Sequence, residues 1–359
     1  MTRALVSMMK KPKLLSLIIA FCAGLVPWAA QAQGAYPNKP VTLVLPFPPG
    51  GSTDIVARTI QPRLSALLGQ PVLVDNRSGA AGVIATNYVA KSAPDGYTLF
   101  LSFDTHAINP IVYKDLPYDT FKDLVPVTLL VRFPLVMGAY GGLPANNLKE
   151  FIALARSQPG KLNYASTGLG SMNHLLAENL KSLAGIDVLH VPYKGGGPAI
   201  QAMLTGEVAF CFLSYAAQKG QMQAGKLKPL AVTGARRMAD LPDVSTVAES
   251  GFPGFEAYSW IGIFAPAGTP DAVIKRLHQD FTATLQDPEV KNKLVAAGDL
   301  GHTELFFSIR SESSLLLQIS PTCHIRGAQT GPVPAAYCLR VRSRRQPVCF
   351  SPLDPAKSR

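Results

Sequence analysis

Apolar runs and segments with helical spacing alternate along this chain from residue 41 to residue 286. Short apolar, β-branched runs are typical of buried strands, and apolar residues three or four positions apart are typical of helices. Regular alternation of the two predicts an α/β fold with mostly parallel sheets. Strands are predicted at 41–46, 71–75, 97–102, 134–140, 162–166, 187–193, 208–213, 228–233 and 258–265, and helices at 53–68, 82–92, 147–157, 171–184, 197–205, 216–224 and 271–286.

This alternating region is large for a single sheet. A stretch of about 270 residues is more than one doubly wound sheet usually needs and is comfortable for two lobes. No internal repeat or low-complexity run precedes residue 300. The pattern therefore predicts two α/β lobes.

A glycine-rich turn, residues 46–54, joins the first predicted strand to the first predicted helix. Gly50 and Gly51 permit positive φ and the close approach of a ligand to the backbone. Ser52 can cap the helix, and Asp54 places a carboxylate in its first turn. Because a helix N-terminus offers free N–H groups and partial positive charge, this turn is a candidate anion site. A capped strand-to-helix turn without a ligand remains an open alternative.

The segment 162–171 repeats this plan later in the chain. It combines a short strand, a turn rich in hydroxyl groups and glycine, and the start of a helix that continues through Leu180. Two such turns suggest that each lobe offers a helix N-terminus to a shared cleft. Two anion sites facing one cleft would suit a dicarboxylate.

Nine short motifs follow one another in a characteristic order. They lie at 36–40, 46–54, 75–82, 105–110, 159–164, 190–196, 224–227, 241–244 and 264–270. Their order and spacing resemble those of the extracytoplasmic solute-binding receptors of tripartite tricarboxylate transporters, the Bordetella uptake gene (Bug) family. The resemblance covers about residues 36 to 300.

This resemblance implies a two-lobed periplasmic-binding-protein-like fold of the two-crossover type, with a ligand cleft between the lobes. Lobe one would comprise 36–136 plus 260–305, and lobe two 137–259, with a hinge near 134–140 and 257–263. The implied function is capture of a small organic carboxylate for a membrane permease, by a monomer without catalysis or a cofactor. A periplasmic ligand sensor that feeds a two-component kinase is the alternative on the same fold.

The predicted ligand site combines the two helix N-termini with other turns that follow strands. In open α/β sheets, ligands bind beyond the carboxyl ends of the strands. The predicted ligand-binding residues are Gly51, Ser52, Thr53, Thr105, Ser166, Thr167, Gly168, Ser171, Lys194 and Gly195.

Two departures from the family pattern bear on specificity. Family members often carry an Asp-Asn pair where this chain has Leu213 and Ser214, and that Asp suits a ligand amino group. Its absence favours a carboxylate without an amino group. Asp104 replaces part of a glycine-rich turn and would repel an anion if it faced the cleft, so we interpret it as a solvated turn or a helix cap.

Other function classes find little support. Residues 33–300 carry 22 basic and 20 acidic side chains, so the net charge of +11 does not indicate a nucleic-acid partner. His106, His174 and His190 lack the spacing of metal ligands. Ser171 and His174 could share a helix face, but no orienting acid or G-x-S-x-G turn accompanies them. A periplasmic hydrolase is therefore the less favoured reading.

The two ends of the chain differ from the body. Residues 1–32 have a basic start, an apolar run over 14–26 and the small-residue sequence Ala30-Gln31-Ala32, which predicts a signal peptide and export to the periplasm. Residues 306–359 are rich in proline and arginine and contain three of the five cysteines. Frequent prolines are incompatible with a helix, so this tail is predicted to be aberrant or disordered, and a shift of reading frame would explain it.

Overall fold

The computed structural model describes residues 36–296 and three short segments, 319–320, 337–339 and 348–350. Nine strands form one large sheet: β1 (Val41–Leu45), β2 (Val72–Asn76), β3 (Thr98–Phe103), β4 (Leu124–Tyr140), β5 (Asn163–Ser166), β6 (Leu189–Pro192), β7 (Phe210–Ser214), β8 (Leu227–Val232) and β9 (Tyr258–Pro266). Their order is β2-β1-β3-β9-β4-β7-β5-β6, with β8 paired to β4.

Helices follow most of the strands, as the sequence predicts. They are α3 (Ser52–Leu68), α4 (Val83–Ala90), α5 (Thr105–Val112), α6 (Leu148–Ser157), α7 (Met172–Ala184), α8 (Gly196–Thr205), α9 (Tyr215–Gln223), α10 (Asp271–Gln286) and α11 (Pro288–Ala296), with a short 3-10 turn, η2 (Ala80–Gly82). Every predicted helix and strand is present, and their ends lie within two residues of the prediction except at β4. The sequence analysis did not predict α5, which contains Pro110 in its interior, or α11.

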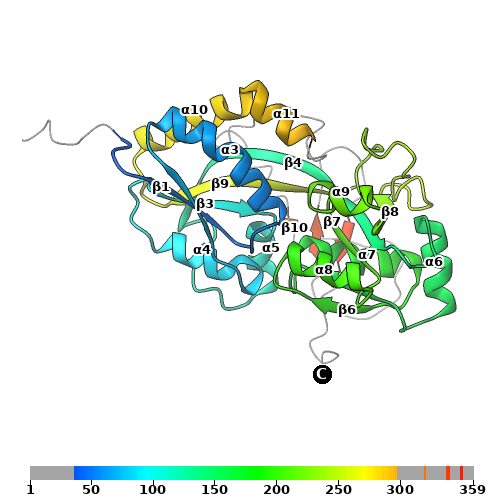
Figure 1. Ribbon diagram of the computed structural model, residues 1–359. Helices are drawn as coiled ribbons and strands as arrows, with labels where there is room; N and C mark the ends of the chain where they lie inside the picture. Colours follow the sequence, from blue (N-terminus) through cyan, green and yellow to red (C-terminus); the bar gives the residue numbers. More distant parts are fainter. Residues whose placement is uncertain (1–35, 297–318, 321–336, 340–347, 351–359) are drawn as a thin grey trace, which may run out of the picture.

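Strands β4 and β9 run side by side across the middle of the molecule and connect its two lobes (Figure 1). Residues Leu124–Pro134 of β4 pair with β9, whereas Leu135–Tyr140 pair with β7 and β8. β4 is longer than predicted, and the part that pairs with β9 contains Pro126 and Pro134. The pairing of this part with β9 has register shifts near Pro126 and Leu129. Such irregularities are among the places where a sheet tolerates proline.

The pairing pattern separates the lobes from the crossing strands. β1 pairs with β2 and β3 in parallel, and β5 pairs with β6 and β7 in parallel. All pairings that involve β4 or β9 are antiparallel. The expectation of mostly parallel sheets is therefore correct within each lobe and wrong where the chain crosses between them. The exact lobe bounds remain a prediction.

Helices cover both faces of the sheet in lobe one. α3 packs with α10 and α11 on one face, and α4 packs against β1 and β3 on the other (Figure 1). Ile60, Leu64, Leu277 and Phe281 are fully buried in one continuous core. This packing fixes the direction in which the first turn of α3 points. None of the helices in the described part of the chain has the length and apolar character of a membrane span.

The signal peptide and most of the tail lie outside the described residues. Within the tail, β10 (Ile319–Ser320), β11 (Tyr337–Leu339) and β12 (Val348–Phe350) pair as a separate antiparallel sheet. The sequence did not predict these short strands. The reading-frame hypothesis for 306–359 remains a prediction.

Candidate functional site

The N-terminus of α3 presents unpaired backbone donors at the edge of lobe one. Gly51 is the N-cap residue, with extended φ and ψ of −87° and 173° and no side-chain cap. The N–H of Ile55 donates to Gly51 O at 3.0 Å. The N–H groups of Ser52 and Thr53 precede it and have no intrahelical acceptor. The helix N-terminus that was predicted to bind an anion is thus present, with Gly51 rather than Ser52 at the cap position. Anion binding at this N-terminus remains a prediction.

Asp54 fixes this turn in place. Its carboxylate, 5% exposed, accepts hydrogen bonds from Gly50 N at 3.1 Å and from Arg58 Nε at 3.0 Å. Asn76 Nδ2 donates to Phe47 O at 2.9 Å and lies 3.4 Å from Asp54 Oδ1. The Asp54 carboxylate is therefore hydrogen-bonded within the turn and to Arg58. It leaves the N–H groups of Ser52 and Thr53 available as donors.

Thr53 carries a buried hydroxyl group without a partner. The residue is 1% exposed, and its Oγ1 has no hydrogen-bond partner among the described residues. Buried polar groups in proteins are nearly always hydrogen-bonded. This hydroxyl belongs to the first turn of α3, next to the N–H groups of Ser52 and Thr53.

The matching turn of lobe two uses its hydroxyl groups internally. Ser166 Oγ contacts His190 Nε2 at 2.6 Å, and Thr167 Oγ1 donates to Asn173 Oδ1 at 2.6 Å. Ser171 caps α7 and donates to Gly168 O at 2.7 Å. These predicted residues therefore shape the turn, and direct ligand contact by their hydroxyl groups remains a prediction.

His190 and His174 form part of a stacked aromatic cluster in lobe two. Their ring centroids lie 4.1 Å apart, and His190 also stacks on Tyr164 at 5.0 Å. Burial, with a contribution from His174, lowers the pKa of His190 to about 4. His174 Nδ1 accepts from Gly170 N rather than facing Ser171. The cluster supports the turn and does not form the Ser171–His174 pair considered for a hydrolase.

The two lobes touch directly near the N-terminus of α3. Ser52 Oγ donates to Ser214 Oγ at 2.8 Å. A Cβ on Gly195 would lie 2.7 Å from Pro48 Cδ, so only glycine permits this approach. The structure thus brings Gly51, Ser52 and Gly195 together across the lobes. Ser214, the last residue of β7, was not among the predicted ligand-binding residues.

A second zone of lobe contact surrounds a cavity of about 200 Å³. A Cβ on Gly170 would lie 2.7 Å from Val112 Cγ1, and Tyr113 OH donates to Leu169 O at 3.4 Å. The cavity is lined by Phe47, Gly79, Ala80, Ala81 and Tyr113 of lobe one and by Thr167, Gly168, Leu169, Pro192, Tyr193 and Lys194 of lobe two. Lys194 is the one cation among these lining residues, and no carboxylate is among them.

The turn before α4 is the main feature that the sequence missed. Ala80 and Ala81 have positive φ of 46° and 48° and are the two non-glycine residues with positive φ in the described chain. Each costs on the order of 1 kcal/mol in this conformation. The Gly-Ala-Ala-Gly sequence was visible as a motif, but nothing in it indicated that both alanines would adopt a left-handed conformation.

Thr105 and Asp104, at the start of α5, are not among the residues that line the cavity. Thr105 is 2% exposed, and its Oγ1 would lie 3.4 Å from a Cβ on Gly82, so it supports the turn instead of lining the cavity. Asp104 does occupy the N-cap position of α5, but it is 1% exposed and accepts a hydrogen bond from Ser259 Oγ on β9. Our interpretation of Asp104 as solvated is therefore wrong. Burial raises its pKa to about 7.

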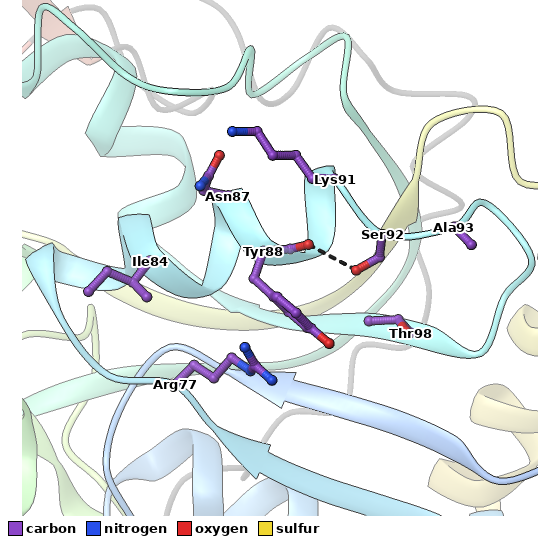
Figure 2. Close-up of a pocket in the computed structure, with 8 residues that line it drawn as sticks. All are labelled: Arg77, Ile84, Asn87, Tyr88, Lys91, Ser92, Ala93 and Thr98. Atoms are coloured by element: carbon purple, nitrogen blue, oxygen red, sulfur yellow. Dashed lines mark hydrogen bonds between the residues drawn. The ribbon is translucent and has the colours of Figure 1, made fainter.

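A larger hollow of about 640 Å³ lies elsewhere on lobe one. Figure 2 shows Arg77 beneath the ring of Tyr88, at 3.5 Å from the ring centroid. Arg77 also pairs with Asp75 at 2.7 Å. Ile84 and Tyr88 on its rim are 53% and 40% exposed, so this is a shallow surface. None of the predicted site residues lines it, and we take the cavity between the lobes as the candidate site.

Among the described residues, no group of three or more His, Cys, Asp or Glu side chains is arranged to hold a metal ion. Cys211 is a buried free thiol, and burial raises its pKa. The cavity offers one ammonium group, that of Lys194. The predicted residues Gly51, Ser52 and Thr53 at the N-terminus of α3 are not among the residues that line it.

Two lobes joined by two crossing strands, with a cavity between them, define a periplasmic-binding-protein fold. A family model described as "Tripartite tricarboxylate transporter family receptor" matches residues 56–303. The chain belongs to this family, which consists of receptors rather than enzymes. The predicted resemblance and fold class are thereby confirmed.

Relatives at intermediate identity span most of the chain. Protein BugT of Bordetella pertussis is 38% identical over 292 residues, which cover 81% of this chain and 90% of BugT. A solved Rhodopseudomonas palustris protein with adipate is 39% identical, with a TM-score of 0.72 over 74% of this chain and 89% of that chain. MatC from the same organism, with bound malate, is 35% identical, with a TM-score of 0.70 over 74% and 90%.

Proposed function

We propose that this protein is a periplasmic receptor that binds a small organic carboxylate and delivers it to the permease of a tripartite tricarboxylate-type transporter. The single observation that carries the ligand class is the first turn of α3, where free N–H groups adjoin the unpartnered hydroxyl of Thr53. A helix N-terminus favours an anion by its N–H groups and its dipole. The relatives solved with adipate and malate support a carboxylate as that anion.

The ligand would carry two carboxylates. One would accept hydrogen bonds from the N–H groups of Ser52 and Thr53 and from the Thr53 hydroxyl. The other would pair with Lys194, the cation of the cavity. Phe47, which also lines this cavity, belongs to the turn 46–54 that leads into α3. Since no lining residue is acidic, an ammonium group on the ligand would be left without a counter-charge. We therefore expect dicarboxylates to bind better than monocarboxylates and better than amino acids.

Binding would be coupled to closure of the lobes. The proposed ligand contacts come from lobe one at α3 and from lobe two at Lys194, so both are made at once only in the closed state. A ligand that contacts both lobes shifts the population toward that state. Direct contacts between the lobes would add to the interactions that the ligand itself makes. They are the Ser52–Ser214 hydrogen bond and the packing of Gly195 and Gly170 against lobe one.

Family membership supports transport of the bound ligand as the function of this receptor. The family description supports a transporter permease as the partner, and the predicted signal peptide supports a periplasmic location. We expect the receptor to be a monomer. A sensor function for a two-component kinase uses the same binding step. Neighbouring permease genes would favour transport, and a neighbouring sensor kinase would favour sensing.

A thermal-shift screen of the purified protein tests the ligand class. The panel holds acetate, malate, adipate, citrate and aspartate at equal concentration and ionic strength. Stabilisation by a ligand grows as the logarithm of concentration over Kd, so malate or adipate should raise the melting temperature most. If aspartate stabilises more than malate, the argument from the missing acidic group fails. If no carboxylate raises the melting temperature, the proposed function fails.

A further inference from the structure

The turn Gly79–Gly82 is a strained wall of the cavity between the lobes. Ala80 and Ala81 both have left-handed backbone conformations, and Gly79, Ala80 and Ala81 line the cavity. Non-glycine residues persist in such conformations only when their surroundings hold them there, and they cluster at functional sites. A turn of this kind therefore needs a neighbouring group that holds it in place.

Asn109 on α5 is that group. Its side chain is fully buried, and Nδ2 donates to Ala81 O at 3.1 Å, across 28 positions in the sequence. Thr105, one helical turn earlier, lies close to Gly82. Helix α5 thus supports the turn at two points, of which only the Asn109 bond fixes a carbonyl group of a strained residue.

The turn also contacts lobe two, at Gly168. A Cβ on Gly168 would lie 3.5 Å from the Cβ of Ala81 and 3.8 Å from its backbone nitrogen. No other side chain separates the two segments at this point. A displacement of the turn by a fraction of an ångström would therefore change how the lobes fit together.

We propose that Asn109 is a positioning residue for ligand binding. Its amide holds the Gly79–Gly82 turn in the strained conformation that completes the cavity and receives Gly168 when the lobes close. Without this bond, Ala80 and Ala81 can relax toward negative φ, and the ligand must then reorder the turn at a cost to its affinity. This assignment rests on the proposed function, because affinity is the property that the turn would serve.

Hydrogen exchange in the ligand-free protein tests the structural half of the proposal. In Asn109→Leu, the amides of residues 79–83 should exchange faster than in the wild type, while those of β1 keep their rates. Gln61→Leu is the matched control, since Gln61 Nε2 donates in the same way to Val72 O at 2.7 Å, on lobe one and away from the cavity. If Asn109→Leu fails to fold, Asn109→Ser replaces it, because the short hydroxyl side chain cannot reach Ala81 O.

Titration with adipate and malate tests the functional half. Asn109→Leu should lose about tenfold in affinity, as expected for a lost polar interaction that orders a site, whereas Gln61→Leu should lose less than about twofold at a similar melting temperature. Ala80→Gly relieves one strained residue, so Asn109→Leu should cost less affinity in that background. A merely structural role for Asn109 would lower stability without this difference in affinity.

Two results overturn the assignment: unchanged exchange at residues 79–83 in Asn109→Leu, or an affinity loss no larger than that of Gln61→Leu. If the wild type binds neither probe but exchange at the turn still rises in Asn109→Leu, the structural assignment stands and the carboxylate proposal fails. The two proposals are in this way separately decided.

Discussion

Thr53 is the residue whose surroundings bear most directly on the ligand. Its hydroxyl is buried without a partner in the described chain, which is unfavourable in the absence of a ligand. Selection for stability alone would favour an apolar side chain here. Our proposal is that this hydroxyl forms its hydrogen bond with the bound ligand.

Replacing this hydroxyl should separate affinity from stability. Thr53→Val removes a hydrogen bond to a charged ligand, worth roughly 1.5–3 kcal/mol, so the affinity for adipate or malate should fall at least about tenfold. The melting temperature of the ligand-free protein should stay the same or rise. Thr59→Val on the same helix, whose Oγ1 donates to Ile55 O, is the control and should leave the affinity unchanged. Equal affinities of Thr53→Val and wild type would remove Thr53 from the site.

Asp104 makes a distinct prediction for the pH dependence of stability. Burial raises its pKa from 3.8 to about 7 in the folded state, so between about pH 4 and 7 the folded protein binds more protons at this group than the unfolded chain. Its contribution to the free energy of unfolding is therefore largest at low pH and is lost as the pH rises through 7. Buried His106, whose pKa falls to about 4, acts in the opposite direction.

The variant Asp104→Asn isolates this contribution, because asparagine can still accept from Ser259 but does not titrate. Urea unfolding at a series of pH values should show that the stability of Asp104→Asn minus that of wild type increases from pH 4 to pH 7. A difference that is constant over this range would mean that Asp104 titrates normally.

At the scale of elements, the ends of α7 provide a matched pair of glycines. Gly170 and Gly185 both have positive φ, 76° and 59°. A Cβ on Gly170 would meet Val112 of lobe one at 2.7 Å, whereas a Cβ on Gly185 would meet nothing within 4 Å. The two positions thus share a left-handed backbone conformation, which would be strained with alanine, and differ in contact between the lobes.

Gly170→Ala and Gly185→Ala should each destabilise the fold by about 1 kcal/mol, but only Gly170→Ala should also weaken ligand binding, because it keeps the lobes apart. Val112→Ala should restore the affinity of Gly170→Ala by making room for the new methyl group. Calorimetric titration of Gly170→Ala, Gly185→Ala and the double variant Gly170→Ala/Val112→Ala measures this. Similar affinities for Gly170→Ala and Gly185→Ala would show that the lobe contact at Gly170 does not limit closure.

The elements themselves were largely predictable, and the contacts between them were not. Local periodicity located α3 and α7 because each has one apolar face and a clear end. It failed at β4, where Pro126 and Pro134 fit only because the strand has bulges and a change of partner. Of the residues predicted from turns after strands, Thr167, Gly168 and Lys194 line the cavity, and ligand contact by them remains a prediction. The roles of Ser214, Asn109 and the Ala80–Ala81 turn depend on tertiary neighbours, which no local pattern specifies.

At the scale of the whole molecule, the tail raises a question about the gene. The family model ends at residue 303, close to where the sequence changes to proline- and arginine-rich composition. Translation of the downstream DNA in the other two frames should reveal a Glu- and Lys-rich amphipathic helix beginning near codon 305. Absence of such a helix from both frames would refute the frameshift and favour a genuine extension.

The central claim is that two lobes close on a carboxylate held at the N-terminus of α3. A crystal structure with the best ligand of the screen tests it most directly. The account predicts closed lobes, with a carboxylate oxygen within hydrogen-bond distance of Thr53 Oγ1 and of the Ser52 or Thr53 N–H, and with a second carboxylate near Lys194. A ligand bound with its carboxylate away from Thr53, or in the hollow between Arg77 and Lys91, would contradict it.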